Sequence, residues 1–410
     1  MNLALSEEQI MIRDAAAGVL AERSASAAVR HAIEQCAGHD DALWRTLAGE
    51  LGWCALTVPE ASGGAGLGAT ELVLMMEQMG RRLACVPYFG TVCLAATALA
   101  QCDTEAARER LARIACGESC ATLALPLSAG FDFGDARSAL PYAEETAGGY
   151  RLSGTLEQVV DGASADLLLV PARIANEAQT VALFELRGAD IAGLTRTPLV
   201  TLDATHPLAR LDLRAVEVPR SALLARGRHA ERALSRTAWF AALSLAAEQV
   251  GGAQQCLDLT LAYTAERVQF GRAIASFQAV KHRCAQMMVE IEASRSVVLG
   301  AAQAWDRAAA ASVEHDDTLA DIAAAKAAAN DAFRFCAQEA IQLHGGVGFT
   351  WEYDPQLYFK RAQAAGAMFG TTSQMLSFIA QHVMDRGERA SNAAVRAHAD
   401  HAQNVLAGVL

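Results

Sequence analysis

The sequence has few aromatic residues, which make up 6% of its 410 residues, and it contains only 9 prolines. Hydrophobic residues nevertheless reach 52%, and much of that share is alanine, which favours helix. Long alanine-rich helices are therefore expected to dominate, rather than a large β-sandwich. At this length the chain can build two or three domains around a large buried core.

The chain also lacks an excess of positive charge, because 34 Lys and Arg stand against 46 Asp and Glu, for a net charge of −12. A protein that binds nucleic acid is expected to carry a basic stripe, so we expect no nucleic-acid partner. An anionic small molecule remains compatible with this charge, because a local group of arginines can bind phosphate whatever the net charge is.

Ten cysteines are present without a Cys-x-x-Cys pair or another metal-ligand spacing, and the closest two are Cys116 and Cys120. We therefore expect reduced thiols and no metal site. The first residues, MNLALSEE, lack the basic start and apolar run of a signal peptide. No uninterrupted apolar stretch reaches the roughly 18 residues of a membrane span. These absences predict a cytoplasmic protein with no membrane span.

Residues 1–118 are expected to form an α-helical domain. Ser6 followed by acidic residues is typical of a helix start. Further helices are expected at 40–51, 69–83, 88–101 and 104–116. The glycine-rich stretch at 56–68, LTVPEASGGAGLG, could cradle phosphate, but no strand precedes it and no lysine follows it. A structural turn is the commoner interpretation.

The composition changes at about residue 119, where short apolar or alternating runs are separated by Gly, Pro and Asp. This pattern predicts a compact β domain over 119–227. From 228 to 410 the chain is expected to form a four-helix bundle. Its helices are expected at 228–268, 277–310, 316–343 and 356–386, with a last piece at 390–408. The expected fold class is α+β.

The stretch at 263–278 reads YTAERVQFGRAIASFQ and lies between two long helical runs. Tyr263 and Arg267 are four residues apart and share one helix face. Gly271 is expected to end the helix, because glycine adopts the left-handed conformation easily. The Arg267 guanidinium would then be free to bind a phosphate or pyrophosphate. On these residues alone, an ordinary helical corner with a salt-bridged arginine is the commoner interpretation.

The whole string resembles the signature of the acyl-CoA dehydrogenase family, and a second match to that family lies at 342–353, QLHGGVGFTWEY. Paired glycines alone would more often be a helix C-cap than a ligand contact. Two long motifs in the right order, however, indicate a divergent bacterial branch of the family, and the resemblance covers nearly the whole chain. It implies an N-terminal helical domain, a central β domain and a C-terminal helical bundle, in that order.

The resemblance also implies an activity, the FAD-dependent α,β-desaturation of an acyl-CoA thioester. In this family a glutamate takes the α-proton, the β-hydride goes to FAD, and the electrons leave through an electron-transfer flavoprotein. Hydrogen bonds to the thioester carbonyl and the adjacent flavin stabilise the developing enolate. Similar proteins act on bulky acyl-CoAs, including those that carry a steroid side chain. The resemblance therefore implies a role in the catabolism of fatty acids or of steroid side chains.

The resemblance assigns cofactor contacts residue by residue. Arg267 matches the residue on the pyrophosphate of FAD. The other matching positions are Phe270, Ile274, Phe277 and Gln278 along the adenosine part, Gln342, Gly345 and Gly346 in the second motif, and Thr371 of a Gly-Thr pair. In the family the groups of the two motifs reach the FAD of a neighbouring subunit. At least a dimer is therefore implied, either a homodimer, a homotetramer or a heteromer with a second acyl-CoA dehydrogenase chain.

The catalytic base of the family is missing from both of its usual positions. Phe369 stands where a Glu-Gly-Thr motif would have its glutamate, and Ala241 stands at the alternative position on the preceding helix. Glu248 follows Ala241 on the same helical face, but two turns further along, which is roughly 10 Å. A salt-bridged or capping carboxylate is the alternative interpretation of Glu248. The sequence therefore leaves the catalytic residue unassigned.

The expected β domain also departs from the family at the flavin. Residues 125–132 replace the pattern Thr-Glu-Pro-x-x-Gly-Ser-Asp, and 158–162 replace Trp-Ile-Thr-Asn-Gly, so the aromatic ring that shields the flavin and the hydroxyl that faces it are missing. Three hypotheses follow. The first is a self-sufficient dehydrogenase, and the alternative to it is a base-lacking partner subunit that completes an FAD site in trans. The third, a flavin-free binding protein on the same fold, is disfavoured because it does not explain why Arg267, Phe270, Gln278 and Gly346 occur together.

Overall fold

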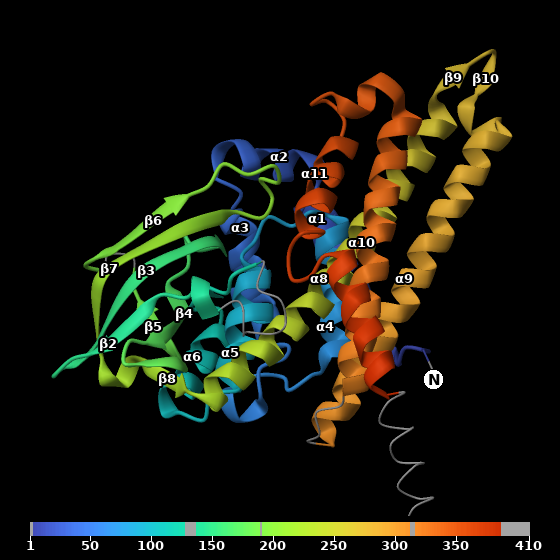
Figure 1. The fold of residues 1–410 in the computed structure, drawn as a ribbon. Coiled ribbons are helices and arrows are strands. Elements are labelled where there is room, and N and C mark those ends of the chain that lie inside the picture. The colour runs from blue at the N-terminus through green and yellow to red at the C-terminus, as the bar shows by residue number, and fades with distance from the viewer. Residues whose placement is uncertain (1–2, 128–136, 189–190, 312–315, 387–410) are drawn as a thin grey trace, which may run out of the picture.

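A computed structural model describes residues 3–127, 137–188, 191–311 and 316–386 (Figure 1). Helices of the N-terminal part, a twisted sheet and a bundle of long C-terminal helices follow one another along the chain, which confirms the expected fold class. Ser128 and Asp132 of the expected flavin segment and the helix expected at 390–408 lie outside the described residues. Within the described part of the chain, no helix has the length and apolar character needed to cross a membrane.

The N-terminal part is helical, as expected. Its helices are α1 (Glu7–Arg23), α2 (Ser26–Gln35), α3 (Asp41–Trp44), α4 (Ala69–Arg81), α5 (Thr97–Ala100) and α6 (Glu105–Ala115). Two segments expected as α-helix are instead π-helical, η1 (Arg45–Glu50) and η4 (Phe89–Ala96). Ser6 starts α1 through a capping box with Gln9, as its sequence predicts.

The glycine-rich stretch at 56–68 is a packed turn. A Cβ atom added to Gly64 would lie 2.0 Å from the carbonyl oxygen of Val58, so the chain itself requires a glycine there. This contact favours the structural interpretation of the stretch over a phosphate-binding loop.

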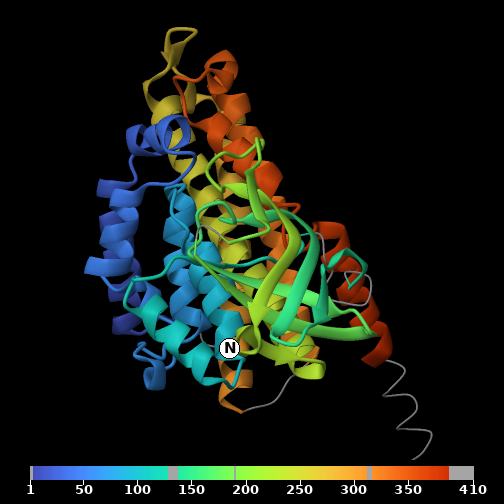
Figure 2. The ribbon, with the colours of Figure 1, turned by 90° about the vertical axis from the view of Figure 1, so that its left-hand side faces the viewer.

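The sheet lies beside the helices and has eight strands (Figure 2). They are β1 (Ala121–Leu123), β2 (Tyr142–Glu145), β3 (Gly149–Val160), β4 (Leu167–Ile174), β5 (Glu177–Arg187), β6 (Leu194–Pro198), β7 (Leu208–Pro219) and β8 (Leu223–Arg226). The order is β6-β7-β3-β2-β4-β5-β8, with β1 paired to β4. The pairs β1–β4 and β2–β4 are parallel and the others antiparallel.

Long helices build the C-terminal part. They are α8 (Arg228–Glu266), α9 (Gln278–Ala310), α10 (Asp316–His344) and α11 (Pro355–Ala365). The short strands β9 (Val268–Gln269) and β10 (Arg272–Ala273) form a hairpin before α9, and the 3₁₀ helix η8 (Gly345–Phe349) follows α10.

The single helix expected at 356–386 is wrong. Helix α11 ends at Ala365, and helical structure resumes at residue 372. Between them, Phe369 and Gly370 have positive φ angles of 49° and 103°, which a right-handed helix cannot contain. The interruption therefore falls on the segment that holds the family's first base position.

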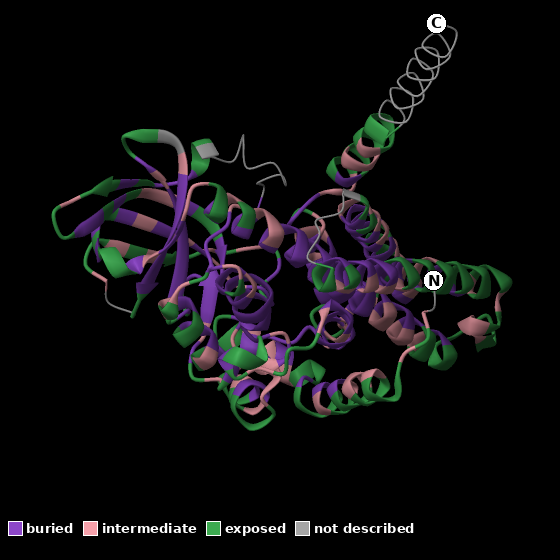
Figure 3. Ribbon diagram, turned by 90° about the horizontal axis from the view of Figure 1, so that it is seen from below, coloured by how far each residue is buried: buried purple, intermediate pink, exposed green. Residues whose placement is uncertain are grey.

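The N-terminal helices and the bundle share one hydrophobic core, and buried residues gather where they meet (Figure 3). Helices α4 and α8 cross through two glycines. A Cβ atom on Gly80 would lie 1.9 Å from the carbonyl oxygen of Glu248, and one on Gly251 would lie 1.8 Å from that of Glu77. This close crossing fixes the position of α8, which carries two of the residues considered for catalysis.

Candidate functional site

The two sequence motifs meet at the far end of the bundle, beside the β9–β10 hairpin (Figure 1). The ring of Tyr263, in the last turn of α8, stacks on the ring of His344, the last residue of α10, with centroids 4.3 Å apart and planes 19° apart. Both rings contact Tyr353 edge-on, at 5.9 and 6.1 Å. The structure therefore brings the motifs together through their aromatic side chains.

The end of α8 differs from the sequence expectation. The helix ends at Glu266 with Arg267 as its C-cap, and Gly271, expected to end the helix, lies in the turn of the hairpin instead. Phe270 and Gly271 both have positive φ angles, 53° and 78°. These two residues form the tight turn that closes the hairpin.

The predicted adenosine contacts on the hairpin are open to solvent. Arg267 is exposed, and among the described residues its guanidinium has no recorded ion pair or side-chain hydrogen bond. Phe270 is 91% exposed, and its ring meets Phe277 edge-on at 6.1 Å. Ile274 is half-buried and Gln278 is exposed at the start of α9. The described contacts therefore do not support a salt-bridged Arg267.

The glycine motif, as we call Gln342, Gly345 and Gly346 of the second sequence motif, is also open to solvent. Gln342, Gly345 and Gly346 are exposed, and a Cβ atom added to either glycine would meet nothing within 4 Å. Gly345 has a φ of +65° just after α10, which fits a helix C-cap as well as a ligand contact. Packing within this chain does not require glycine at 346. A molecule that approaches the backbone from outside would benefit from it. The exposed arginine, aromatic rings and glycines of this end fit the adenosine end of FAD.

Thr371 lies apart from the other predicted cofactor residues. It precedes the helix at 372–386 and borders a surface groove of about 800 Å³, together with residues of α10 and α11. Asn330 borders the same groove and lies 14 residues before His344 on α10. At 1.5 Å per residue, the groove is roughly 20 Å from the stacked Tyr263 and His344 rings.

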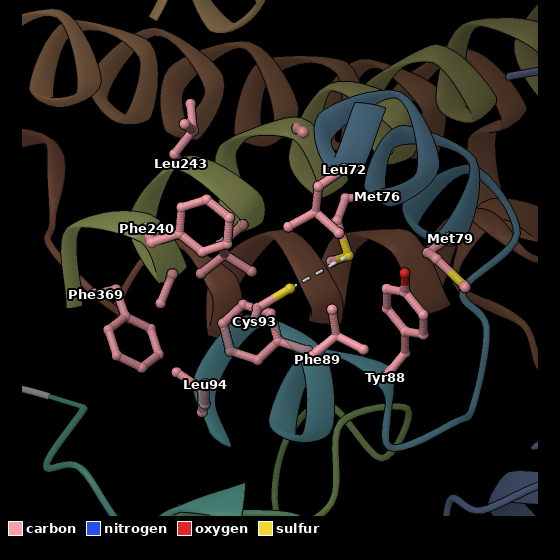
Figure 4. Close-up of a cluster of buried hydrophobic side chains, with 14 of the residues drawn as sticks. Leu72, Met76, Met79, Tyr88, Phe89, Cys93, Leu94, Phe240, Leu243 and Phe369 are labelled. Atoms are coloured by element: carbon pink, nitrogen blue, oxygen red, sulfur yellow. Dashed lines mark hydrogen bonds between the residues drawn. The ribbon is translucent and has the colours of Figure 1, made fainter. Parts of the chain in front are cut away.

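Both usual base positions lie in the hydrophobic core, and Figure 4 shows Phe369 there. Phe369 is 2% exposed and packs edge-on against Phe89, with ring centroids 5.7 Å apart, while Ala241 has no exposed surface. The backbone N–H of Phe369 donates to the carbonyl oxygen of Leu127 at 3.3 Å. Val160, at the position of the family's flavin-facing hydroxyl, is 1% exposed. The described surroundings are therefore apolar where the family has hydrogen-bonding groups.

Glu248 lies in a buried cluster of charged residues. Its carboxylate pairs with Arg361 of α11, whose Nε lies 2.9 Å from Oδ2 of Asp203 in the β6–β7 connection. His206 of the same connection has its Nε2 3.5 Å from Oε2 of Glu248. All four residues are buried.

Burial controls the protonation of this cluster. It raises the pKa of the Glu248 carboxyl, an effect that the facing Arg361 guanidinium opposes. It also lowers the pKa of His206 well below its ordinary value, and the positive charge of Arg361 adds to this effect. The imidazole is therefore neutral, and Arg361 is the positively charged partner that both Asp203 and Glu248 face.

Lys326 extends the cluster toward the segment that contains Phe369. Its Nζ donates to the side-chain oxygens of Gln249 and Asn330 at 3.2 and 2.5 Å and to the carbonyl oxygen of Ala365 at 3.0 Å. The amide of Asn330 donates in turn to the carbonyl oxygen of Gly370 at 3.2 Å. Burial lowers the pKa of Lys326 to about 7.

The sequence reasoning missed Asp203, Lys326 and Arg361. A signal was present for Lys326, which is the single charged residue in the run AAAKAAAN at 323–330. A lone charge within an apolar helical run often needs a buried partner. No comparable pattern marks Asp203 or Arg361.

Lys326 is expected to make stability rise with pH. Above pH 7 the folded chain has released the Lys326 proton, whereas the unfolded chain keeps it up to a pKa of ~10.4. The unfolded state then binds more protons, so the free energy of unfolding rises by up to ~1.4 kcal/mol per pH unit. Urea unfolding of the native chain and of Lys326→Met between about pH 7 and 8.5 measures this slope.

The slope of the free energy of unfolding against pH should be less positive in Lys326→Met than in the native chain. Lys281→Met, which removes an exposed lysine of α9, provides the matched control and should keep the native slope. Parallel curves for the native chain and Lys326→Met would show that Lys326 titrates normally.

Comparison with known proteins gives consistent matches along the chain. Residues 6–118 match the model of the acyl-CoA dehydrogenase N-terminal domain, and residues 232–384 match that of the C-terminal domain. The acyl-CoA dehydrogenase IpdE2 of Mycobacterium tuberculosis is 32% identical over 92% of this chain and 98% of its own.

Two solved structures are similar over nearly their whole length. A chain of the ChsE4–ChsE5 complex from Mycobacterium tuberculosis has a TM-score of 0.81 and 28% identity, and covers 94% of this chain and 99% of its own. A chain of a variant of the Tcur3481–Tcur3483 steroid ACAD has a TM-score of 0.79 and 30% identity, with 93% and 99% covered.

Proposed function

The chain belongs to the acyl-CoA dehydrogenase family, and from that premise we propose that it is the base-lacking subunit of a heteromeric acyl-CoA dehydrogenase. The family is FAD-dependent and oxidises acyl-CoA thioesters. In the proposed assembly a second chain of the family carries the catalytic glutamate, and the electrons pass to an electron-transfer flavoprotein. A bulky acyl group, such as a steroid side chain, is the proposed substrate class.

The main support is the burial of both base positions. Phe369 and Ala241 carry no group that accepts a proton, and both are enclosed in the core. Glu248 is the remaining carboxylate considered for catalysis, but it is 4% exposed and paired with Arg361. Its use as a base would break that ion pair and leave Arg361 and Asp203 to rearrange in the interior, which is costly.

The open end of the bundle supports a role in trans. Arg267 would hold the pyrophosphate of FAD, Phe270 and Phe277 would offer flat faces to its adenosine part, and Gly345 and Gly346 would let the backbone come close. Bound FAD supplies the acceptor for the hydride. The contribution of this chain is to bind and orient the adenosine end of the cofactor.

The similar structures support a heteromer. The ChsE4–ChsE5 complex and the Tcur3481–Tcur3483 steroid ACAD are each named for two different chains. The self-sufficient dehydrogenase is the second candidate, because the raised pKa of the Glu248 carboxyl would suit a base if Arg361 moved away.

The flavin content of the purified chain separates these candidates. We expect the full chain alone to be nearly colourless, and we expect about one FAD for every two chains when it is co-expressed with a second family member that keeps Glu-Gly-Thr. The visible spectrum and the flavin released on denaturation measure both quantities. The second chain expressed alone is the control. A yellow protein with about one FAD per chain, bleached by an acyl-CoA, would instead establish a self-sufficient dehydrogenase.

A further inference from the structure

Helix α2 of the N-terminal part contacts the segment 350–354, which follows the glycine motif. Arg30 of α2 pairs with Asp354, with Nη2 2.6 Å from Oδ1, and its Nη1 donates to the carbonyl oxygen of Trp351. Ser26 donates to the same carboxylate at 2.7 Å. The indole Nε1 of Trp351 donates to Glu34 at 2.8 Å. We call Ser26, Arg30 and Glu34 of α2 the α2 clamp.

Arg30 is the central residue of the α2 clamp. Its guanidinium lies 5.1 Å from the ring centroid of Trp351, in addition to its bonds to the Trp351 carbonyl and the Asp354 carboxylate. The side chains of Arg30 and Asp354 are only 17% and 20% exposed. A fork-shaped donor can hold a carbonyl and a carboxylate together in one geometry, so this contact fixes position as well as charge.

The glycine motif lies between two held ends. On one side His344 stacks on Tyr263, and its Nδ1 lies 2.6 Å from the carbonyl oxygen of Ala340. On the other side the α2 clamp holds Trp351 and Asp354. Between them Gly345 and Gly346 have no neighbour within 4 Å of an added Cβ atom, whereas Gly348 of the same 3₁₀ helix is buried against the carbonyl oxygen of Ile341. The positions of the two held ends therefore contribute to the arrangement of the two exposed glycines.

Helix α2 is itself fixed to the rest of the molecule. Just after α2, a Cβ atom on Gly38 would lie 2.5 Å from the carbonyl oxygen of Ala204, in the connection that also carries Asp203 and His206. The N–H of Asp40 donates to the carbonyl oxygen of Cys85 at 2.8 Å. Helix α2 is therefore a fixed support for the segment that follows the glycine motif, although more than 300 residues separate Arg30 from Trp351 in the sequence.

We propose that Arg30 is a positioning residue for cofactor binding, which holds Gly345 and Gly346 in the arrangement that receives the adenosine end of a neighbouring chain's FAD. The proposal rests on the proposed function, because it assumes that the glycine motif contacts FAD. Arg30 acts through Trp351 and Asp354 and does not touch the cofactor. A motif in the C-terminal bundle is thereby completed by the N-terminal helices of the same chain.

Arg30→Met tests the proposal in the FAD-loaded assembly of the full chain. We expect FAD to dissociate about 5- to 10-fold faster, within the usual range for coupling between separate sites. Dissociation is followed as the rise in flavin fluorescence after dilution. The flavin absorption spectrum before dilution should be unchanged, because the glycine motif would contact the adenosine end of FAD and not its ring. Glu34→Ala should have a smaller effect in the same direction, because it removes the acceptor of the Trp351 indole only.

Two further variants separate positioning from a general loss of structure. Arg23→Met removes an exposed arginine of α1 that pairs only weakly with Glu22, and it should leave FAD dissociation unchanged. Arg30→Lys keeps a charge beside Asp354 but cannot bond to two acceptors as a fork, so it should restore part of the native rate.

An unchanged FAD dissociation rate in Arg30→Met would overturn the proposal. If that variant does not fold, Arg30→Lys and Glu34→Ala are measured in its place, and native rates in both would overturn the proposal. If Arg267→Ala loses FAD while the Arg30 variant keeps the native dissociation rate, the positioning role of Arg30 is rejected and the proposed function is not. If Arg267→Ala also keeps its FAD, the proposed function itself is wrong.

Discussion

Replacing Arg361 by methionine is expected to lower the free energy of unfolding by about 3–5 kcal/mol, the usual cost of removing one partner of a buried ion pair. Arg361 is 2% exposed and faces the carboxylates of Asp203 and Glu248, which are 3% and 4% exposed. Without the guanidinium, two negative charges would remain in the interior. The loss should therefore exceed that from a change in packing of similar size, since methionine fills much of the same volume.

Urea unfolding followed by circular dichroism measures this effect. Arg334→Met is the matched control, because Arg334 pairs with Asp331 on the surface of α10 with side-chain exposures of 56% and 49%. It should cost no more than about 0.5 kcal/mol. If uncompensated charge is the cause, the triple variant Asp203→Asn, Glu248→Gln, Arg361→Met should regain part of the lost stability. A triple variant less stable than Arg361→Met would contradict that explanation.

The cluster around Arg361 joins all three parts of the chain. Asp203 and His206 come from the sheet connection, Glu248 from α8 and Arg361 from α11. The ring of His206 also lies 5.9 Å from that of Phe89 in the N-terminal part, which in turn packs against Phe369. These contacts tie Glu248 into the framework that joins the three parts, and its carboxylate is already engaged by Arg361.

The sequence predicted the order of helical, β and helical parts, because periodicity and composition change where the architecture changes. It did not predict the π-helical turns at η1 and η4, since their local composition does not differ from that of an α-helix. The break after Ala365 was also missed. The glycines at 366 and 370 give a weak signal, and the backbone at 369–370 is held by hydrogen bonds to Leu127 and Asn330 from distant segments.

The candidate site, like the fold, could be predicted from the sequence only in part. Residues of the two motifs could be located from the sequence, because each motif is a short local pattern. The stacking of Tyr263 on His344 and the α2 clamp could not, since they join residues that are far apart in the chain. Polar contacts of this kind depend on which helices become neighbours, and a single sequence does not contain that information. Thr371 was grouped with the hairpin residues by resemblance, and only the structure showed their separation along α10.

Replacing Arg267 by alanine is expected to weaken FAD binding about 10- to 100-fold, the range for a charged hydrogen bond worth ~1.5–3 kcal/mol. Arg267 is exposed and has no recorded ion pair or side-chain hydrogen bond within the described ranges, so its removal should leave the fold intact. The charge would instead serve the pyrophosphate of FAD on a neighbouring chain. Titration of the apo-assembly with FAD, followed by the quenching of flavin fluorescence, gives the dissociation constant.

A second substitution at 267 separates the contribution of charge to FAD binding from that of the planar guanidinium. Arg267→Lys keeps the charge but loses the planar fork, so it should lie between the native chain and Arg267→Ala. Arg220→Ala removes an exposed arginine of the sheet part and should leave the dissociation constant unchanged. The difference between Arg267→Ala and the native chain should shrink at high salt, because salt screens exposed charges. If Arg267→Ala binds FAD as tightly as the native chain, the open end of the bundle does not hold the cofactor.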